Sequence, residues 1–287
     1  MKKMMQGAAA LIALVGAGES MALEWMSNSV GFRYGQQFTN PNNPDKFAKR
    51  IYSFTHADGY RYGSNFFNLD VFLSDNRDPR KGTDHGGSEV YAVYRHQLYA
   101  SRVFDRPLGT GLVKDYAFTL GFDASRNNNL ASAKKRALVF GPTLKFNGPG
   151  VLDLSLLYYR EKNHFGVPGA RHPDHTFDTT YMLNLTWMRP FKVGNHAAKF
   201  QGFVNYVGEK GEDYNDKDTA AETLVRTALM VAALPGDKRQ PNLDADVEYG
   251  IHLLKRSAVA LRDAANPGVG RITPPALSAD TPKPGGG

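Results

Sequence analysis

Aromatic and hydrogen-bonding side chains alternate with apolar ones along residues 63–75, which read GSNFFNLDVFLSD. The first set consists of Phe66, Asn68, Asp70 and Phe72. Phenyl rings can stack against a flat solute, and amide and carboxylate oxygens can accept hydrogen bonds from its polar groups. A period of two residues is typical of a β-strand. The segment is therefore predicted to be a strand with one solute-facing side and one apolar side.

Motifs for catalysis and for cofactor or metal binding give no comparable signal. The sequence has no cysteine, which excludes thiolate chemistry and disulfides. It also lacks a phosphate-binding loop, a dinucleotide-binding glycine pattern and a serine elbow. The run from Arg171 to His175 (RHPDH) has no second cluster of ligands nearby, so we expect a solvated loop there. We expect no enzyme, no cofactor and no metal.

The first 22 residues have the three parts of a secretory signal. Lys2 and Lys3 precede a short apolar run, and small residues lead to a cleavage site after Ala22. The apolar run is shorter than the roughly 20 residues that a membrane-spanning helix needs. We therefore predict export of a mature chain of 287 − 22 = 265 residues.

The charge and hydropathy of the chain narrow the class of partner. Removing the signal, with Lys2, Lys3 and Glu19, lowers the formal net charge from +7 to +6. The basic residues are scattered, so we expect anionic lipid head groups or anionic solutes as partners rather than nucleic acid. Mean hydropathy is −0.43, a value that a β-barrel also gives because only alternate residues of its strands meet lipid.

The alternation of residues 63–75 recurs in ten further segments. These are Trp25–Gly35, Arg50–His56, Ser88–Tyr99, Tyr116–Asp123, Arg136–Phe146, Val151–Tyr159, Thr179–Met188, Ala197–Val207, Glu222–Val231 and Leu243–Ile251. Runs of about ten residues match the length of a tilted membrane strand. The pattern predicts an all-β fold, an antiparallel transmembrane β-barrel of about 12 strands over residues 23–252.

The connections between these segments are alternately short and long. Residues 147–150 (NGPG) form a tight turn between two alternating runs, which is typical of a β-hairpin. Long polar connections are predicted at Asp75–Gly87, Arg160–Thr176 and Gly208–Ala221. In outer-membrane barrels short turns lie on the periplasmic side and long loops on the outer side. We expect the same division here, with the long turn Asn40–Pro44 as a further connection.

Four stretches resemble a known family. They are TNPNNPDKFAKRIYSFTHADGYRYGSNFFNLDV (Thr39–Val71), EVYAVYRHQL (Glu89–Leu98), LVFGPTLKF (Leu138–Phe146) and AKFQGFVNYVGEKGED (Ala198–Asp213). They look like the Tsx-like nucleoside-specific channel-forming proteins of the bacterial outer membrane, over roughly Trp25–Tyr249. The resemblance implies a monomeric twelve-stranded barrel in the cell outer membrane, inserted by the barrel-assembly machinery. Its narrow lumen would hold nucleosides in transit between aromatic and ionisable side chains.

The C-terminus departs from that family. Family members end on an apolar strand with a terminal aromatic residue, the usual signal for barrel assembly, whereas this chain ends in Gly285, Gly286 and Gly287. Residues 253–287 contain no visible closing strand and are expected to form a divergent or disordered tail.

The predicted lumen face supplies the candidate solute path. Its members are Arg33, His56, Phe66, Asn68, Asp70, Phe72, Glu89, Tyr91, Arg95, Lys199, Phe203 and Asn205. Stacking of a base on an aromatic ring is worth roughly 1–3 kcal/mol, and the polar members can bind ribose hydroxyls. As a set they would select solutes, as rings of pore-lining groups do. The alternative is that opposite charges pair across the barrel and hold its shape.

Two other classes of function stay open from the sequence. One is an outer-membrane barrel hydrolase that uses His56 or His96 with a serine or aspartate at the rim. The other is a soluble periplasmic β-barrel that binds a ligand. The preferred prediction is a passive channel for nucleosides or similar small polar solutes.

Overall fold

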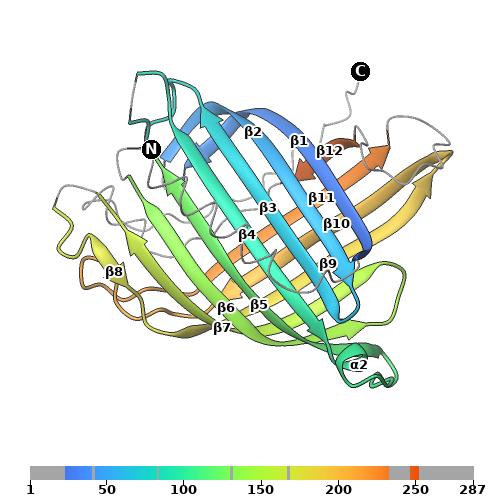
Figure 1. Cartoon of the computed structure of the whole chain (residues 1–287). Helices are drawn as coiled ribbons and strands as arrows, with labels where there is room; N and C mark the ends of the chain where they lie inside the picture. Colours follow the sequence, from blue (N-terminus) through green and yellow to red (C-terminus); the bar gives the residue numbers. More distant parts are fainter. Residues whose placement is uncertain are drawn as a thin grey trace, which may run out of the picture.

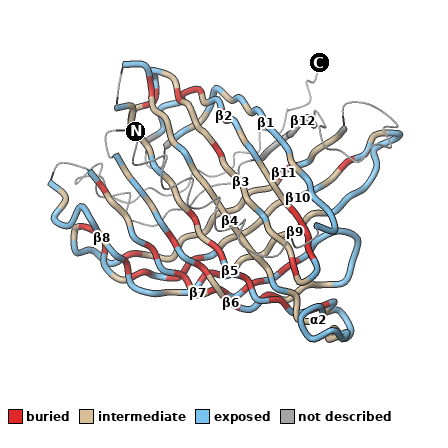
Figure 2. Tube along the Cα trace, viewed as in Figure 1, coloured by how far each residue is buried: buried red, intermediate tan, exposed pale blue. Residues whose placement is uncertain are grey.

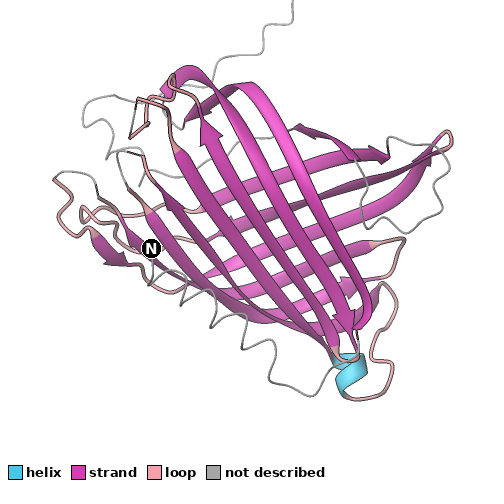
Figure 3. Cartoon of the chain, turned by 45° about the horizontal axis from the view of Figure 1, so that its top comes forward, coloured by secondary structure: helices cyan, strands magenta, loops and turns pink. Residues whose placement is uncertain are grey.

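The computed structural model describes residues 23–40, 43–82, 84–129, 132–166, 169–232 and 246–251. The predicted signal segment 1–22 and the predicted tail 253–287 lie outside these residues. Within them the chain is almost entirely β-strand (Figure 3). The one helix of this part, α2 (Ala100–Val103), is four residues long, and no described helix is long and apolar enough to cross a membrane.

The described part of the chain contains twelve strands in succession. They are β1 (Leu23–Asn40), β2 (Asn43–Tyr60), β3 (Gly63–Ser74), β4 (Ser88–Tyr99), β5 (Val113–Asn127), β6 (Lys134–Phe146), β7 (Val151–His164), β8 (Asp174–Thr176), β9 (Thr180–Val193), β10 (His196–Val207), β11 (Glu222–Ala232) and β12 (Asp246–Ile251). The alternating segments of the sequence account for all of these except β8.

The strands form one antiparallel sheet with neighbours in sequence order, from β1 through β7 to β9, β10, β11 and β12 (Figure 1). The three-residue strand β8 pairs with the end of β7. The sheet curls into a half-barrel, and over the described residues β1 and β12 are its two edges. The predicted all-β, antiparallel fold is confirmed. The predicted closure of about 12 strands into a complete ring is not found among these residues.

Several element boundaries differ from the predicted ones. Pro44 was expected in a long turn but lies in β2, because the β1–β2 hairpin continues to the pair Asn40 and Asn43. Arg160 was expected in a loop, but β7 continues to His164 and pairs there with β6 and β8. In each case the strand continues because a partner strand supplies backbone hydrogen bonds to polar residues that have no apolar alternation.

The two ends of the half-barrel have different connections. We call one end of the sheet the turn end; it carries residues 61–62, 147–150, 194–195 and α2, and it lies on the right-hand side of Figure 1. The loop end is the opposite one, where strands are joined by residues 75–87, 128–133, 165–179 and 208–221. The three connections predicted to be long and polar therefore lie together at one end.

The two faces of the sheet have opposite character. Along β5 and β7 buried and exposed residues alternate almost without interruption (Figure 2). The concave face is identified by contacts between strands that are not neighbours: Arg226 of β11 approaches Asp70 of β3, and Gln97 of β4 bonds Asp153 of β7. Such contacts are possible only across the inside of the curl.

The opposite, convex face is apolar and exposed. Val30 is 80% exposed, Phe32 59% and Leu156 51%, although such side chains lose free energy in water. Other members are Tyr34, Tyr52, Phe54, Val90, Tyr116, Phe118, Leu120, Leu138, Leu152, Leu154, Tyr181, Leu183, Phe200, Tyr206 and Leu229. An apolar face that extends over this many strands exceeds the small patches usual on soluble monomers.

Candidate functional site

The concave face carries eleven of the twelve predicted solute-path residues. Starting from Arg33, the strand register places on one face Phe66, Asn68, Asp70, Phe72, Glu89, Tyr91, Arg95, Lys199, Phe203 and Asn205. They come from β1, β3, β4 and β10, strands that are far apart in the sheet. The curl brings them to one shared interior.

A charged group built on Asp70 spans this interior. Its Oδ1 accepts hydrogen bonds from Arg33 Nη2 at 2.9 Å and from Ser53 Oγ at 2.6 Å. Its Oδ2 lies 3.7 Å from Arg226 Nη1 on β11. The side chains of Asp70 and Arg33 are only 6% and 12% exposed, so their attraction is weakly screened. One carboxylate thus holds two guanidinium groups from opposite margins of the sheet.

Arg95 forms a second pair on this face. Its Nη1 lies 2.7 Å from Asp123 Oδ1 and donates to the carbonyl oxygens of Tyr94 at 2.8 Å and Phe122 at 3.0 Å. The side chain lies over Gly121, where an added Cβ would come within 2.8 Å of Arg95 Cδ. Glycine is therefore what allows the arginine to lie flat along the sheet.

An ionic cluster of four side chains lies on the concave face at the loop end. Glu161 is 2% exposed and lies 2.9 Å from Lys135 Nζ and 3.2 Å from Lys210 Nζ. Tyr159 donates to the same carboxylate at 2.5 Å. Lys210 also bonds Glu222 at 2.7 Å, so β6, β7, β11 and the 208–221 loop meet here. Two lysines balance two carboxylates, which is what a buried ionic group requires.

Lys210 anchors its loop inside the half-barrel. It is the only one of these ions that comes from a connection, and its Nζ lies 4.6 Å from the centre of the Phe177 ring. The neighbouring loop is bonded to it, since Asp178 N donates to Lys210 O at 2.9 Å. Phe165 and Tyr214 stack with ring centres 4.4 Å apart. The connections 165–179 and 208–221 therefore pack as one unit at the loop end.

Toward the turn end, the concave face carries smaller polar groups. Lys145 Nζ bonds Asp153 at 2.7 Å and Gln97 at 2.9 Å. A row of hydroxyl groups joins three strands: Thr119 and Thr143 are 2.6 Å apart, and Thr143 and Ser155 are 2.7 Å apart. These side chains can accept or donate hydrogen bonds to a solute, but most of their donors and acceptors already bond one another.

The predicted stacking rings differ in availability. Phe66 is 41% exposed, and within the described residues no ring or cation contacts it. Phe72 has a cation on it, because Lys49 Nζ lies 5.9 Å from its ring centre and 5.2 Å from that of Phe47. Of these two predicted rings, Phe66 is the one whose face a flat solute can reach.

His56 is not on the concave face, contrary to the sequence prediction. It pairs with Asn28 and Phe67 and shares the convex face with Phe54. Its Nδ1 lies 2.7 Å from Asn28 Oδ1, and its Nε2 lies 2.9 Å from Asp58 Oδ2. The alternation of β2 required this placement, because residue 56 has the same parity as the outward Tyr52 and Phe54.

A second histidine completes a polar network on the convex side of the turn end. His96 Nδ1 lies 2.8 Å from Asn65 Oδ1, and its Nε2 lies 3.3 Å from Tyr60 OH. Asn65 donates to Asp58 at 2.8 Å, which joins this group to His56. None of the partners of either histidine ring is a serine or threonine hydroxyl. The network links β1 to β4 and does not form a nucleophile with its base.

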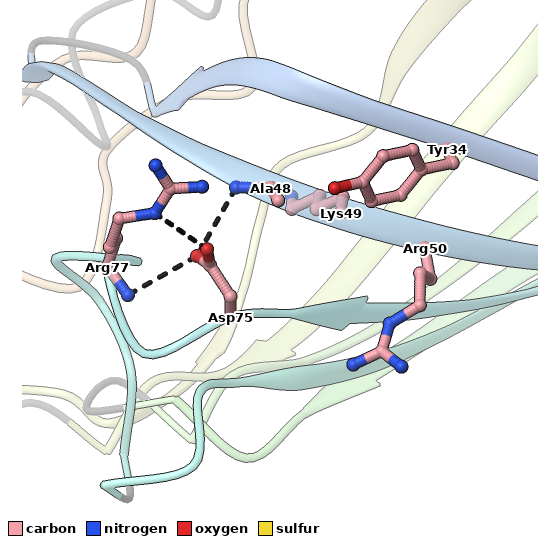
Figure 4. A pocket seen from close by; sticks show the side chains of 6 residues that line it. All are labelled: Tyr34, Ala48, Lys49, Arg50, Asp75 and Arg77. Atoms are coloured by element: carbon pink, nitrogen blue, oxygen red, sulfur yellow. Dashed lines mark hydrogen bonds and ion pairs between the residues drawn. The ribbon is translucent and has the colours of Figure 1, made fainter.

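A shallow pocket of about 300 Å³ lies at the loop end, lined by Tyr34, Ala48, Lys49, Arg50, Asp75 and Arg77 (Figure 4). Asp75 accepts a hydrogen bond from Arg77 Nε at 2.7 Å and another from the backbone N–H of Ala48 at 3.2 Å. Burial alone would raise the pKa of Asp75, but these hydrogen bonds outweigh burial and lower the pKa. The remaining charge of the pocket is positive, so it suits an anionic group.

Several residues of the interior were missed by the sequence analysis, and four of them hold together distant parts of the chain: Lys135, Glu161, Lys210 and Arg226. Three of them follow the alternation of their strands and could have been assigned to the polar set. Lys210 gave no such signal, because it lies in a loop. Within the described ranges, no group of three or more histidine and acidic residues could hold a metal ion.

Comparison with known proteins adds no further assignment. No family model, no curated protein and no solved structure matches this chain.

Proposed function

We propose that the protein is a passive channel of the bacterial outer membrane for nucleosides or similar small polar solutes. One observation carries the proposal: the curled sheet is apolar and exposed on its convex face, and its concave face carries buried ion pairs beside a small apolar cluster. A soluble β-protein normally buries its apolar face in a core. The reverse arrangement is favourable where lipid covers the outside and water fills the inside.

The balance of charge on the concave face favours neutral polar solutes. Asp70, Asp123, Asp153 and Glu161 each lie within 3 Å of a basic side chain. A path lined by compensated charges offers hydrogen bonds without a strong net field, so neither anions nor cations are strongly favoured. Phe66 adds an accessible ring for a planar base. This combination supports the nucleoside preference that the family resemblance implies.

The proposal includes closure of the half-barrel in the membrane. Unpaired backbone groups at the β1 and β12 edges would be costly in lipid, where no water can satisfy them. A monomer inserted by the barrel-assembly machinery must therefore have both of these edges paired in the membrane.

Planar-bilayer recording of refolded protein tests the channel. Discrete conductance steps are expected, and nucleosides added to one side should reduce the current, whereas ribose alone should do so less. Absence of steps would refute the channel, and current that is insensitive to nucleosides would refute the solute preference. A matched variant is Phe66→Ala, which should weaken nucleoside block and leave open conductance in place.

The location in the membrane has its own test. An intact barrel isolated from the outer-membrane fraction should migrate faster on gels before heating than after it. Recovery of the expressed protein in the soluble fraction without detergent would instead favour the soluble ligand-binding alternative.

A further inference from the structure

Five cations lie together on the convex face at the loop end, and we call them the basic patch. They are Arg126, Lys134, Arg136, Arg160 and Lys162. Arg126 pairs with Lys134, and Arg136 pairs with Lys162 on the next strand. Neighbouring strands are about 4.8 Å apart and alternate residues of one strand about 7 Å apart. The five residues therefore span about 10 Å across β5, β6 and β7 and about 14 Å along these strands.

Acidic side chains do little to neutralise Arg136 and Arg160 of the basic patch. Asp174 on β8 is near it, but its carboxylate bonds His164 Nδ1 at 2.9 Å. The pKa of Asp174 is lowered first by that hydrogen bond and only then by the charges of His164, Lys162 and Lys134. Arg136 and Arg160 are exposed and have no ion pair within the residues that the structure describes. This contrasts with the concave face, where the buried ions are paired.

An apolar surface adjoins the basic patch on the same strands. In β6 the next outward residue after Arg136 is Leu138, which is 48% exposed and pairs directly with Arg160. Beyond it, Phe140 and Tyr158 stack with ring centres 4.6 Å apart. Leu156, 51% exposed, continues the apolar surface toward the turn end. Charged and apolar surfaces therefore meet along one line across β5, β6 and β7.

We propose that the basic patch binds the phosphate groups of anionic phospholipid molecules whose acyl chains lie on the adjoining apolar surface. A ligand with a phosphate at one end and hydrocarbon at the other matches this boundary, and a free anion would match only half of it. Lysine and arginine suit such a boundary, since their aliphatic stems lie along apolar surface while the charges reach the phosphates. This inference rests on the proposed membrane location and names a lipid partner for it.

The basic patch lies at the loop end, and the turn end has no comparable group of outward cations among the described strand residues. The corresponding outward positions at the turn end carry few cations, of which Lys114 on β5 and Arg189 on β9 are exposed examples. Arg50, by the pocket of Figure 4, adds a further positive charge at the loop end. The loop end therefore offers the stronger attraction to anionic head groups.

Native mass spectrometry of the full-length folded protein in a neutral detergent tests the inference. The protein is mixed with equal amounts of dioleoyl phosphatidic acid and dioleoyl phosphatidylcholine, and the retained lipids are counted. Wild-type protein should retain phosphatidic acid in preference. Each cation near a lipid surface contributes about fivefold in affinity, so Arg136→Gln with Arg160→Gln should reduce this preference by about 30-fold.

Two controls keep the result specific. Lys114→Gln with Arg189→Gln also removes two exposed outward charges, but at the turn end, and should change the preference less than about twofold. Inorganic phosphate at the same concentration should not displace phosphatidic acid. Equal losses in both double variants, displacement by inorganic phosphate, or wild-type protein without a preference would each overturn the inference.

Conductance in phosphatidylcholine bilayers separates this inference from the proposed function. A wild-type protein that conducts but shows no preference for phosphatidic acid overturns the lipid site and leaves the channel in place. A protein that prefers phosphatidic acid but never conducts supports the basic patch and refutes the channel.

Discussion

Asp70→Asn is the sharpest test of the ionic group that spans the interior. The substitution preserves the size of the side chain and an oxygen that can accept the hydrogen bond of Ser53, but it removes the negative charge. Arg33, only 12% exposed and 2.9 Å from Asp70, then loses this carboxylate as a counterion. Removing one member of a buried ion pair typically costs about 3–5 kcal/mol.

The structure points to the lower end of that range. Arg33 retains its hydrogen bond to Ser53 Oγ at 2.6 Å. The contact with Arg226 is longer, at 3.7 Å, and the Arg226 side chain is 27% exposed, so it adds at most about 1 kcal/mol. We expect Asp70→Asn to lower the free energy of unfolding by about 3 kcal/mol.

Urea titration in lipid vesicles, with the folded fraction read from heat-modifiable migration, measures this change. The control is Asp84→Asn, the same chemical change at an exposed loop residue, which should alter the free energy of unfolding by less than about 0.5 kcal/mol. Reversal potentials in a salt gradient should also shift toward anion selectivity in Asp70→Asn alone. Equal stability of the two variants, with unchanged selectivity, would refute the reasoning.

Three further changes test the loop anchor, a close backbone approach and a rim carboxylate. Lys210→Met removes a cation from two carboxylates. It should speed proteinase K cleavage of the 208–221 loop about tenfold, which corresponds to a loss of about 1.4 kcal/mol in the free energy of loop opening. Lys192→Met, at an exposed residue, should leave the cleavage rate unchanged. Gly121→Ala should lower the free energy of unfolding in urea by about 1–3 kcal/mol, because the new Cβ lies 2.1 Å from Tyr94 O. Gly31→Ala, whose new Cβ would lie 3.5 Å from Ser53 Cβ, should lower the free energy of unfolding by less than about 0.5 kcal/mol. The pKa of Asp75 is lowered in the folded protein, so its carboxylate should stabilise the fold fully above the unfolded pKa of about 3.9. This stabilisation should disappear as the pH falls through the folded pKa. Proteolysis of the 75–87 loop should therefore rise at acid pH in wild type and be less pH-dependent in Asp75→Asn.

Each of these expectations has an outcome that contradicts it. Equal cleavage rates in the two lysine variants would show that Lys210 does not anchor its loop. Equal stability of the two alanine variants would mean that the sheet near Gly121 can widen without cost. A 75–87 loop whose proteolysis has the same pH dependence with aspartate or asparagine at position 75 would exclude the carboxylate as its acid-sensitive group.

Alternation alone was sufficient to predict most of the sheet. β4 was predicted with its observed ends, Ser88 and Tyr99, because polar loops bound a strict two-residue period. The β1–β2 hairpin was underestimated because its loop-end half contains Asn, Pro, Asp and Lys, which carry no apolar period. β8 has only three residues, too few to show any period.

The sequence predicted which face of a strand a residue occupies, because this depends on its odd or even position in the strand. It did not predict contacts between distant strands, because these depend on how the sheet curves. Arg33 and Asp70 were assigned correctly to one face, yet their contact and that with Arg226 depend on how far the sheet curls. No property of a single strand encodes that curl. His56 was misassigned because its polarity was given more weight than its position in the alternation. Lys210 was missed because loop residues are expected to be solvated, whereas the buried carboxylate of Glu161 and the partly exposed carboxylate of Glu222 bind this one inside the half-barrel.

The unbroken alternation of the two faces also sets what changes in length the chain can accept. Inserting one residue before Phe118 in β5 would turn every following side chain of that strand to the opposite face. Phe118 and Leu120 would then lie on the concave face, and Thr119 and Asp123 on the convex face. Insertions between Asp75 and Gly87 would leave every strand in register. Changes in the length of this protein should therefore accumulate in the loop-end connections and be absent from the strands, so the loop end is where new surface properties can arise without loss of the fold.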